Sequence, residues 1–321
     1  MLRDPNAQVH HIVKRISIIT PTFNEEENVE ELYRQVTAVT DGIPQYEWEF
    51  LFIDNASRDG TVGILRKMAA TDPRVKVIVN TRNFGPMRSP HHAVLQATGD
   101  AVITMCADLQ DPPTLIPAFI EKWEAGYAIA LGQKVSSEES QLLYFLRTIY
   151  YKLVRRLADV QLIDHVTGFG IYDRKVVEVF RKIDDPNPYG RGLICDLGYE
   201  VARIPYRQPE RKRGLSKNNF YVLYDLAMLG ITNHSKIPLR LATMMGFSMA
   251  LLSLLFAVAY FIYKLIFWSR FPVGQAPVVI GLFLFSSVQL FFTGVLGEYI
   301  AAIHTQVLHR PLVIEKERIN F

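Results

Sequence analysis

The sequence has few cysteines, little net charge and no secretory signal, and each absence narrows what the chain can be. Its 321 residues include only Cys106 and Cys195, so no disulfide framework is expected and a reducing compartment suits the chain. The formal net charge of +3 is too small to indicate a nucleic-acid partner. The first residues, MLRDPNAQVHHIVKR, contain no apolar run, so we expect no signal peptide and a soluble part that stays in the cytosol.

Short apolar runs alternate with amphipathic stretches in the first part of the chain. The runs are rich in Ile, Val and Phe without polar alternation, which is typical of strands covered on both faces. We expect strands at residues 16–20, 50–54, 75–79, 101–105 and 128–132. We expect helices at residues 26–40, 60–70, 90–97 and 114–125. This β-α-β-α-β order predicts an α/β domain with a mostly parallel sheet and helices on both faces.

Two of these helices carry start signals. Ser89 precedes Pro90, and Asp111 precedes Pro112. A small polar residue followed by proline is typical of an N-cap and the first turn of a helix. We therefore predict that helices begin at these two positions.

Two long uncharged stretches lie in the last third of the chain, at residues 241–263 and 276–297. Each is long enough, at about 1.5 Å per residue, to cross a bilayer core of about 30 Å. A pair of spans places both flanks on one side of the membrane, and basic flanks predict the cytoplasmic side. These flanking residues are Lys236, Arg240, Arg310, Lys316 and Arg318. Lys264 and Arg270 in the link weaken this bias, and a buried helical hairpin of a soluble protein is the alternative.

Two further segments have a helical pattern. Residues 140–158 combine leucines with Arg and Lys side chains, so this helix either packs on the domain surface or lies on anionic lipid. The aromatic, amphipathic segment that precedes the first uncharged stretch suits a helix in the membrane interface. The basic loop at residues 211–217 is typical of juxtamembrane segments that attract anionic lipid.

Polar residues follow three of the predicted strands. The segment TPTFNEEEN ends the first strand, Asp54 ends the second, and Asp108 and Gln110 come just after the fourth. Ligands of parallel sheets bind beyond the carboxyl ends of the strands, so we expect these groups along one edge. One carboxylate there can accept hydrogen bonds from a base or ribose. A second can hold Mg²⁺ or Mn²⁺ against a diphosphate, where the metal offsets the charge of a departing nucleotide.

The chain resembles the family 2 inverting glycosyltransferases, and among them the polyprenyl-phosphate glycosyltransferases, such as dolichol-phosphate mannosyltransferases and bactoprenol glucosyltransferases. The resemblance lies in the two uncharged stretches and in the segments TPTFNEEENVEELY, FIDNASRDGT, TRNFG, GDAVITMCADLQDPP and GFGIYDRKVVE. It implies a GT-A fold, which is Rossmann-like with a mostly parallel sheet. It also implies an order of parts: a GT-A catalytic domain at 1–215, a juxtamembrane amphipathic segment at 216–240, two transmembrane helices within 241–300 (about 241–264 and 276–299), and a cytoplasmic tail at 301–321.

The resemblance also implies roles for individual residues. Those expected to bind the nucleotide are Pro21, Phe23, Glu25, Asp54 and Asp108. Asp108 matches the second acid of the family's Asp-x-Asp metal motif and Gln110 the glutamine after it, so both are expected to be catalytic and to hold Mg²⁺ or Mn²⁺. The residues expected to grip the acceptor phosphate, some from a loop that the family closes over its site, are Lys134, Arg147, Arg211, Ser216 and Lys217.

The chain departs from the family pattern at several positions. Asn55 and Cys106 stand where the family usually has acids, and cysteine is a poor ligand for hard Mg²⁺. Gly168 and Gly170 replace an acid and an arginine, and Phe23 stands where tyrosine is frequent. These departures bear on the donor sugar and the metal dependence, and they leave the expected reaction class unchanged.

We therefore expect an enzyme of the cytoplasmic face of the cell membrane that transfers a hexose from UDP-glucose to undecaprenyl phosphate with inversion, for modification of a cell-envelope glycan. A lipid phosphate needs no general base, because its second pKa is about 6, as for a phosphoserine. UDP-N-acetylhexosamine or a GDP-sugar are alternative donors. A non-catalytic membrane scaffold that binds nucleotide sugar is the alternative outside enzymes. The resemblance further suggests a homo-oligomer.

Overall fold

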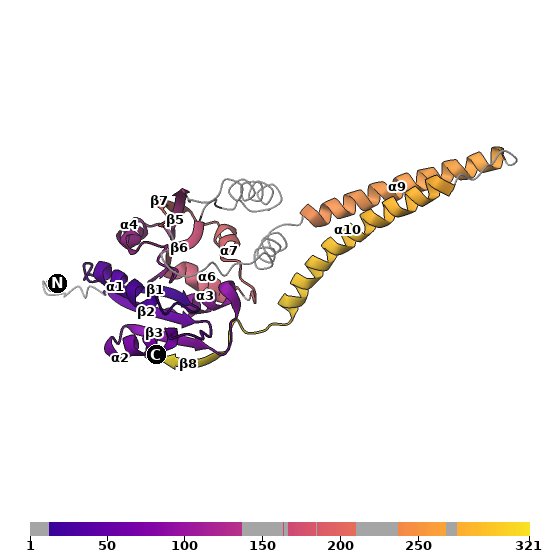
Figure 1. Ribbon diagram of the computed structural model, residues 1–321. Coiled ribbons are helices and arrows are strands. Elements are labelled where there is room, and N and C mark those ends of the chain that lie inside the picture. Colours follow the sequence, from indigo (N-terminus) through magenta and orange to yellow (C-terminus); the bar gives the residue numbers. More distant parts are fainter. Residues whose placement is uncertain (1–12, 137–162, 164–165, 184, 210–236, 268–274) are drawn as a thin grey trace, which may run out of the picture. The chain divides into compact units, whose positions relative to one another are not determined.

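The computed structural model describes residues 13–136, 163, 166–183, 185–209, 237–267 and 275–321 (Figure 1). The chain divides into two compact units, which are described separately below. The first unit contains the sheet, and the described part of the second consists of two long helices.

The centre of the first unit is a parallel sheet of four strands. In spatial order these are β4 (Ala101–Thr104), β1 (Arg15–Thr22), β2 (Glu47–Asp54) and β3 (Val75–Asn80). Each coincides with an apolar run of the sequence. Backbone carbonyl and amide groups in these strands are satisfied along the ladder, so the apolar side chains can be buried on both faces. The prediction of a mostly parallel sheet is confirmed.

Helices cover both faces of this sheet. In β2, Phe50 and Phe52 belong to one core cluster, and Leu51 and Ile53 belong to the other, because successive side chains of a strand point to opposite faces. The first cluster is closed by α1 (Val29–Thr40), α2 (Thr61–Thr71) and α4 (Ile116–Glu124). The second is closed by α3 (Gly85–Gln96), α6 (Arg174–Lys182) and α7 (Gly190–Asp196).

The sheet extends beyond its parallel centre on both sides. The added strands are β5 (Ile129–Ser136), β6 (Val166–Asp173), β7 (Val201–Arg207) and β8 (Glu315–Ile319). The full order is β7-β5-β6-β4-β1-β2-β3-β8. Strand β6 runs antiparallel between β4 and β5, and β8 runs antiparallel to β3. The sheet is therefore mixed at its edges, and the sequence analysis did not predict β6, β7 or β8.

Both predicted helix starts are wrong. Helix α3 begins at Gly85, whose φ of +88° suits glycine, so Ser89 and Pro90 lie within the helix. The buried Ser89 hydroxyl instead accepts a hydrogen bond from Asn80 Nδ2 at 3.0 Å. Asp111 caps no helix either, because the short 3₁₀ helix η1 (Pro113–Leu115) has no side-chain cap and the Asp111 carboxylate bonds elsewhere.

The second unit contains α9 (Ile237–Ile266) and α10 (Gln275–Val307), which pack against each other. Residues Ile237–Phe256 of α9 and Leu284–Val307 of α10 are long and apolar enough to cross a membrane. Neither stretch is buried in the structure: Phe247 and Leu290, for example, are 74% and 70% exposed. A buried hairpin of a soluble protein would have covered these side chains.

Candidate active site

The candidate site lies at the edge of the sheet where the parallel strands end. Pro21 and Thr22 close β1 and pair with Ile53 and Asp54, which close β2. Strand β4 lies on the other side of β1 and leads into the turn that contains Asp108. The topology therefore brings the ends of β1, β2 and β4 to a common edge, as the sequence predicted from the positions of its acids.

Asp54 is fully buried and shapes the loop that follows it. One carboxylate oxygen accepts the backbone N–H of Ser57 at 2.8 Å, and the other accepts the hydroxyls of Ser57 and Thr22 at 2.5 and 3.3 Å. A carboxylate that accepts an N–H three residues ahead fixes a tight turn, and this explains how Ala56 holds a φ of +62°. Asp54 thus has a positioning task that the sequence did not reveal, and its contact with a nucleotide stays a prediction.

The loop after β1 interlocks with the loop after β2. The backbone N–H of Asn24 donates to Ser57 Oγ at 2.8 Å, and Asn24 Oδ1 accepts the N–H of Arg58 at 2.8 Å. The N–H of Glu25 donates to Thr61 Oγ1 at 2.9 Å. Phe23 and Glu25 are both partly buried. The segments predicted to surround the nucleotide base therefore form one hydrogen-bonded structure.

The turn after β4 places Asp108 and Gln110 at the same edge. Leu109 between them has a φ of +60°, and Asp108 Oδ1 accepts the N–H of Gln110 at 3.2 Å. Gln110 Nε2 donates to the carbonyl of Pro209 at 3.5 Å, which joins this turn to the segment after β7. Both side chains are partly exposed. The two predicted catalytic residues therefore share one turn that is open to solvent.

The buried Asp111 stabilises the turn that contains Asp108 and Gln110. Its carboxylate is 3% exposed, accepts the N–H of Cys106 at 2.9 Å and accepts the hydroxyl of Tyr206 at 3.4 Å. Burial raises the pKa of Asp111 to about 6, and the negative charge of Asp108 adds to the rise, while Lys134 opposes it. A charge that acts on Asp111 in this way lies close to it. The fold thus brings Lys134 on β5, a predicted acceptor ligand, to the turn that carries Asp108.

Cys106 is a neutral thiol at physiological pH. Its side chain reaches solvent, but the protein around it is dense, and the resulting desolvation raises the pKa of the thiol well above its usual value. The nearby charges of Asp111 and Asp108 raise this pKa further. Cys106 occupies the position of the first acid in the family's Asp-x-Asp metal motif. It therefore offers a metal ion neither a carboxylate nor a thiolate.

Comparison with known proteins decides the family. The sequence model of "Glycosyl transferase family 2" matches residues 17–180. The chain belongs to this family.

Several relatives of this family 2 glycosyltransferase are similar over nearly their whole length. The bactoprenol glucosyl transferase of Shigella phage SfV is 35% identical, over 94% of this chain and 98% of that protein. The bactoprenol glucosyl transferase of Shigella phage SfX is 34% identical, over 95% and 99%. The prophage bactoprenol glucosyl transferase homolog of Escherichia coli (strain K12) is 32% identical, over 94% and 98%. The predicted membership of the family and the GT-A fold are confirmed.

The family's divalent metal fits this site only as a partner of a bound diphosphate. Among the described residues no three His, Cys, Asp or Glu side chains could hold a metal ion together. Mg²⁺ is usually held by one or two carboxylates together with substrate phosphates and water, and not by a cage of protein ligands. The partly exposed Asp108, with the amide of Gln110 in the same turn, meets that requirement.

Two of the family departures have a structural explanation. Asn55 joins the end of β2 to the loop after β3: its Nδ2 donates to Asn83 Oδ1 at 2.9 Å and to the Gly85 carbonyl at 3.2 Å, while its Oδ1 accepts the N–H of Phe84 at 2.8 Å. An aspartate at position 55 could accept but not donate. Asn55 is therefore required for this loop, and sequence reasoning treated it only as a missing acid.

Gly170 is the second. Strand β6 passes so close to β5 that a Cβ at Gly170 would lie 2.2 Å from the Ala130 carbonyl oxygen. Gly168 has a φ of +97°, and its carbonyl accepts the hydroxyls of Thr104 and Tyr172 at 2.5 and 2.7 Å. An arginine at position 170 would therefore clash with β5, and an acid at position 168 would be strained by the positive φ.

Four predicted acceptor residues lie outside the described part of the chain: Arg147, Arg211, Ser216 and Lys217. Their roles stay predictions. Of the five, Lys134 alone has a described position.

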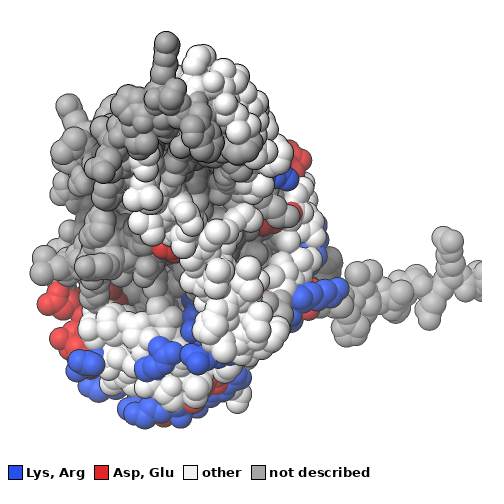
Figure 2. Space-filling model, turned by 90° about the vertical axis from the view of Figure 1, so that its right-hand side faces the viewer, with Lys and Arg blue, Asp and Glu red and all other residues white. Residues whose placement is uncertain are grey.

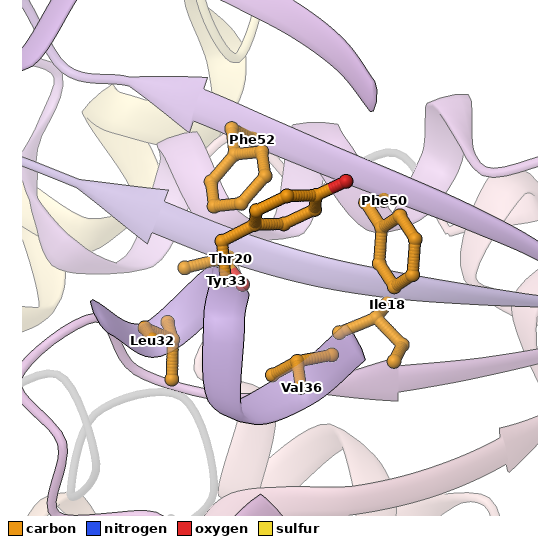
Figure 3. A pocket seen from close by; sticks show the side chains of 7 residues that line it. All are labelled: Ile18, Thr20, Leu32, Tyr33, Val36, Phe50 and Phe52. Carbon is orange, nitrogen blue, oxygen red and sulfur yellow. The ribbon is translucent and has the colours of Figure 1, made fainter. Parts of the chain in front are cut away.

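A small cavity lies away from this edge, between α1 and the sheet (Figure 3). Its volume of about 10 Å³ has room for about one water molecule. Leu32, Tyr33 and Val36 of α1 face Phe50 and Phe52 of β2 across it. The lining is mainly apolar, and the cavity is a packing defect of the core and not a substrate site.

Proposed function

We propose that this glycosyltransferase moves glucose from UDP-glucose to a polyprenyl phosphate, with undecaprenyl phosphate as the natural acceptor. The supporting observation is the similarity to bactoprenol glucosyl transferases, which runs through 94% of this chain and 98% of the phage SfV protein. A match of that extent includes the two long apolar helices as well as the sheet. The product, a polyprenyl-phosphate sugar, would serve the modification of a cell-envelope glycan.

The nucleotide would bind against the interlocked loops after β1 and β2. Pro21, Phe23 and Glu25 would surround the base, and Asp54 would hold the loop of Ser57 in place for the ribose or base. Hydrogen bonds hold these loops together without any contribution from a nucleotide. Preorganisation of this kind limits the entropy lost on binding.

The diphosphate would lie at the turn of Asp108 and Gln110, which would hold Mg²⁺ or Mn²⁺. A bound divalent ion supplies electrostatic stabilisation of the negative charge on the leaving nucleoside diphosphate. The buried Asp111 keeps the turn in shape through the N–H of Cys106. Metal dependence and the choice between the two ions belong to this proposal.

The acceptor phosphate would be the nucleophile. An oxygen of the phosphate bonds to the anomeric carbon as the bond from that carbon to the diphosphate oxygen breaks, and UDP leaves with the electron pair. A single displacement of this kind inverts the anomeric configuration. Because the phosphate already carries negative charge near pH 7, no side chain has to remove a proton. Lys134 would hold the phosphate, and catalysis would come from positioning and charge stabilisation.

The helices α9 and α10 would span the membrane and leave the sheet on the cytoplasmic side. Two spans return the chain to the side from which it started. Arg240 in the first turn of α9, with Arg310 and Lys316 beyond the end of α10, favours the cytoplasmic side by the positive-inside rule. Assembly into a homo-oligomer stays a prediction.

A matched pair of aspartates tests the proposal. Asp108 follows β4, whereas the exposed Asp100 precedes the same strand at the opposite edge, where it accepts the N–H of Arg15 at 2.8 Å. The purified full chain is given radiolabelled UDP-glucose, UDP-N-acetylglucosamine or GDP-mannose together with undecaprenyl phosphate. We expect lipid-soluble label from UDP-glucose, abolished in Asp108→Asn and kept in Asp100→Asn.

Other outcomes would contradict the proposal. If label came from a different donor, that donor would take the place of UDP-glucose in the proposal, and the proposed reaction class would stand. Binding of UDP-glucose without transfer under any metal condition would instead support the non-catalytic scaffold. Equal activity of Asp108→Asn and Asp100→Asn would show that Asp108 has no role in the transfer.

A further inference from the structure

Two arginines stack on the ring of Phe84, near the end of β3, and one of them, Arg88, bonds to the carbonyl of Pro311, the residue after Arg310. The guanidinium of Arg82 lies 4.1 Å from the centre of this buried ring, and that of Arg88 lies 5.4 Å from it. Arg310, which is distant in the sequence, is close enough to lower the pKa of Arg88, after burial and Arg82. We call Arg82, Arg88 and Arg310 the arginine cluster.

The arginine cluster has no counter-charge among the described residues. Arg82 donates to the carbonyl of Asn83 at 3.1 Å and Arg88 to that of Pro311 at 2.6 Å, and neither forms an ion pair within the described ranges. The buried Nε of Arg88 has no hydrogen-bond partner in the part of the chain that the structure describes. Like charges that converge without an acid repel each other, and an anion relieves that repulsion.

Neighbouring arginines of the same unit differ in this respect. Arg66 pairs with Glu317, and Arg318 pairs with Glu315. Figure 2 shows Lys and Arg side chains along the lower part of the view, with Asp and Glu side chains beside and among them. Within the described ranges, Arg66 and Arg318 are thus paired with acids of β8, whereas the arginine cluster is not.

The backbone adds to this positive field. Helix α3 begins at Gly85, directly after Phe84, and its first N–H, that of Gly85, donates to Asn83 Oδ1 at 2.8 Å. The N-terminus of a helix carries partial positive charge, which favours an anion. The site therefore combines guanidinium donors, an apolar ring and a helix N-terminus.

The sequence position of Arg310 indicates where the anion comes from. Arg310 follows Val307, the last residue of α10, by three residues, and the apolar stretch of α10 that could cross a membrane also ends at Val307. A residue this close to the end of a span lies at the membrane surface, where lipid phosphates are abundant. Arg88 donates to the carbonyl of Pro311, the residue after Arg310. Arg88 and its neighbour Arg82 are therefore also placed at the membrane surface.

We propose that the arginine cluster binds the phosphate of an anionic bilayer phospholipid and thereby docks the sheet-bearing unit on the membrane. None of its arginines is among the residues predicted to bind the nucleotide, the metal or the acceptor phosphate. It depends on the proposed function only in requiring that α10 spans the membrane, and sugar transfer is not part of it. The fork of an arginine side chain suits bidentate contact with a phosphate.

Native mass spectrometry of the full chain in detergent tests this proposal without any turnover. The protein is given phosphatidylglycerol or phosphatidylcholine, and retained lipid is compared between wild type, Arg82→Gln/Arg310→Gln and the control Arg34→Gln. Arg34 is an exposed arginine on α1 that pairs with Glu31. Arg88→Lys serves as a variant that keeps the charge and loses the fork.

We expect retained phosphatidylglycerol to fall about fivefold for each charge removed, since a juxtamembrane basic residue contributes about that factor to binding. Arg34→Gln should match wild type, and phosphatidylcholine should be retained weakly by all variants. Equal retention of phosphatidylglycerol by the double variant and wild type would overturn the proposal. Displacement of the lipid by UDP would show that the arginine cluster belongs to the donor site. Equally tight binding of inorganic phosphate would show that the cluster does not select a lipid.

Discussion

At the scale of single residues, Asn55 shows how one side chain can define a site without contacting substrate. Its amide donates to Asn83 and Gly85 and accepts from Phe84, so it joins the ends of β2 and β3. Both the nucleotide loops and the arginine cluster are built on that join. An acid at position 55, as many family members have, requires a different loop after β3.

We predict that Asn55→Asp destabilises the chain by about 1–3 kcal/mol, because two donors are lost and a buried carboxylate faces two oxygen atoms. The matched control is Asn83→Asp. Asn83 uses only its side-chain oxygen, which accepts from Asn55 and from the Gly85 N–H, so an aspartate retains both contacts. Thermal unfolding in detergent should show a lower Tm for Asn55→Asp than for Asn83→Asp, and equal values would refute this account of the loop.

His91 gives a prediction for pH. It packs on Phe180 with 5.5 Å between ring centres, and burial, with a smaller effect of His92, lowers the pKa of His91 from 6.5 to about 4. Between these values the unfolded chain binds a proton that the folded chain does not, so stability falls as the pH falls from 6.5 towards 4. Above pH 6.5 the histidine is neutral in both states and has no such effect.

The variant His91→Phe keeps the ring contact and removes the titration. Its Tm should fall less than that of wild type between pH 6.5 and 4, and the two curves should run parallel above pH 7. Curves that stay parallel over the whole range would show that folding does not lower the pKa of His91.

At the scale of elements, β6 is an antiparallel strand inserted into a parallel sheet. Its glycines let it approach β5 and β4 closely, and Gly170 lies against the Ala130 carbonyl. The close approach fixes the distance between β4, which leads to Asp108, and β5, which carries Lys134. The geometry of the site therefore depends on a position where only glycine fits.

We predict that Gly170→Ala destabilises the chain by at least about 1–3 kcal/mol, the usual cost of overpacking a core, and also lowers transfer activity. The control is Gly63→Ala in α2, where an added Cβ meets nothing within 4 Å. That change should stabilise the helix by about 0.5–1 kcal/mol, because alanine favours a helix over glycine. Thermal unfolding of Gly170→Ala and Gly63→Ala is compared under the same conditions. Equal Tm values would contradict this explanation.

The sequence predicted the parallel centre of the sheet because its strands are continuous apolar runs. It missed β6, whose two glycines lower strand propensity, and β8, whose sequence EKERI is mostly charged. Charged residues are common on edge strands, where they discourage pairing with other chains. Strand β8 could not be predicted locally, since β3, its partner, lies far away in the sequence.

The candidate site was predicted to a similar extent. Asp54, Asp108 and Gln110 were expected at one edge, because parallel strands end together. The loops around them rest on Asn24, Ala56 and Leu109, which have positive φ without being glycine. Alanine and leucine carry no sequence signal for this conformation, and the carboxylates of Asp54 and Asp108, which accept N–H groups just ahead of them, span these positions. The hydrogen bonds of Asp54 and the structural role of Asn55 could therefore not be predicted from the sequence.

At the scale of the whole molecule, the segment after α10 is part of the catalytic unit and not a free tail. Glu315 bonds to His92 at 2.6 Å, and Glu317 pairs with Arg66. Asn320 Nδ2 donates to the carbonyls of Ala69 and Val75 at 2.7 and 2.9 Å. The chain therefore runs from the sheet through two apolar helices and back into the same sheet, which suits an enzyme whose acceptor resides in a membrane.

The central claim is that a lipid phosphate, and not a hydroxyl, receives the sugar. The direct measurement supplies the purified full chain with radiolabelled UDP-glucose and either undecaprenyl phosphate or undecaprenol, and follows label in the organic phase over time. We predict label on undecaprenyl phosphate alone, because the phosphate is already charged near pH 7 and needs no general base, whereas the hydroxyl of undecaprenol would need one. Equal labelling of undecaprenol, or no labelling of undecaprenyl phosphate, would contradict the account.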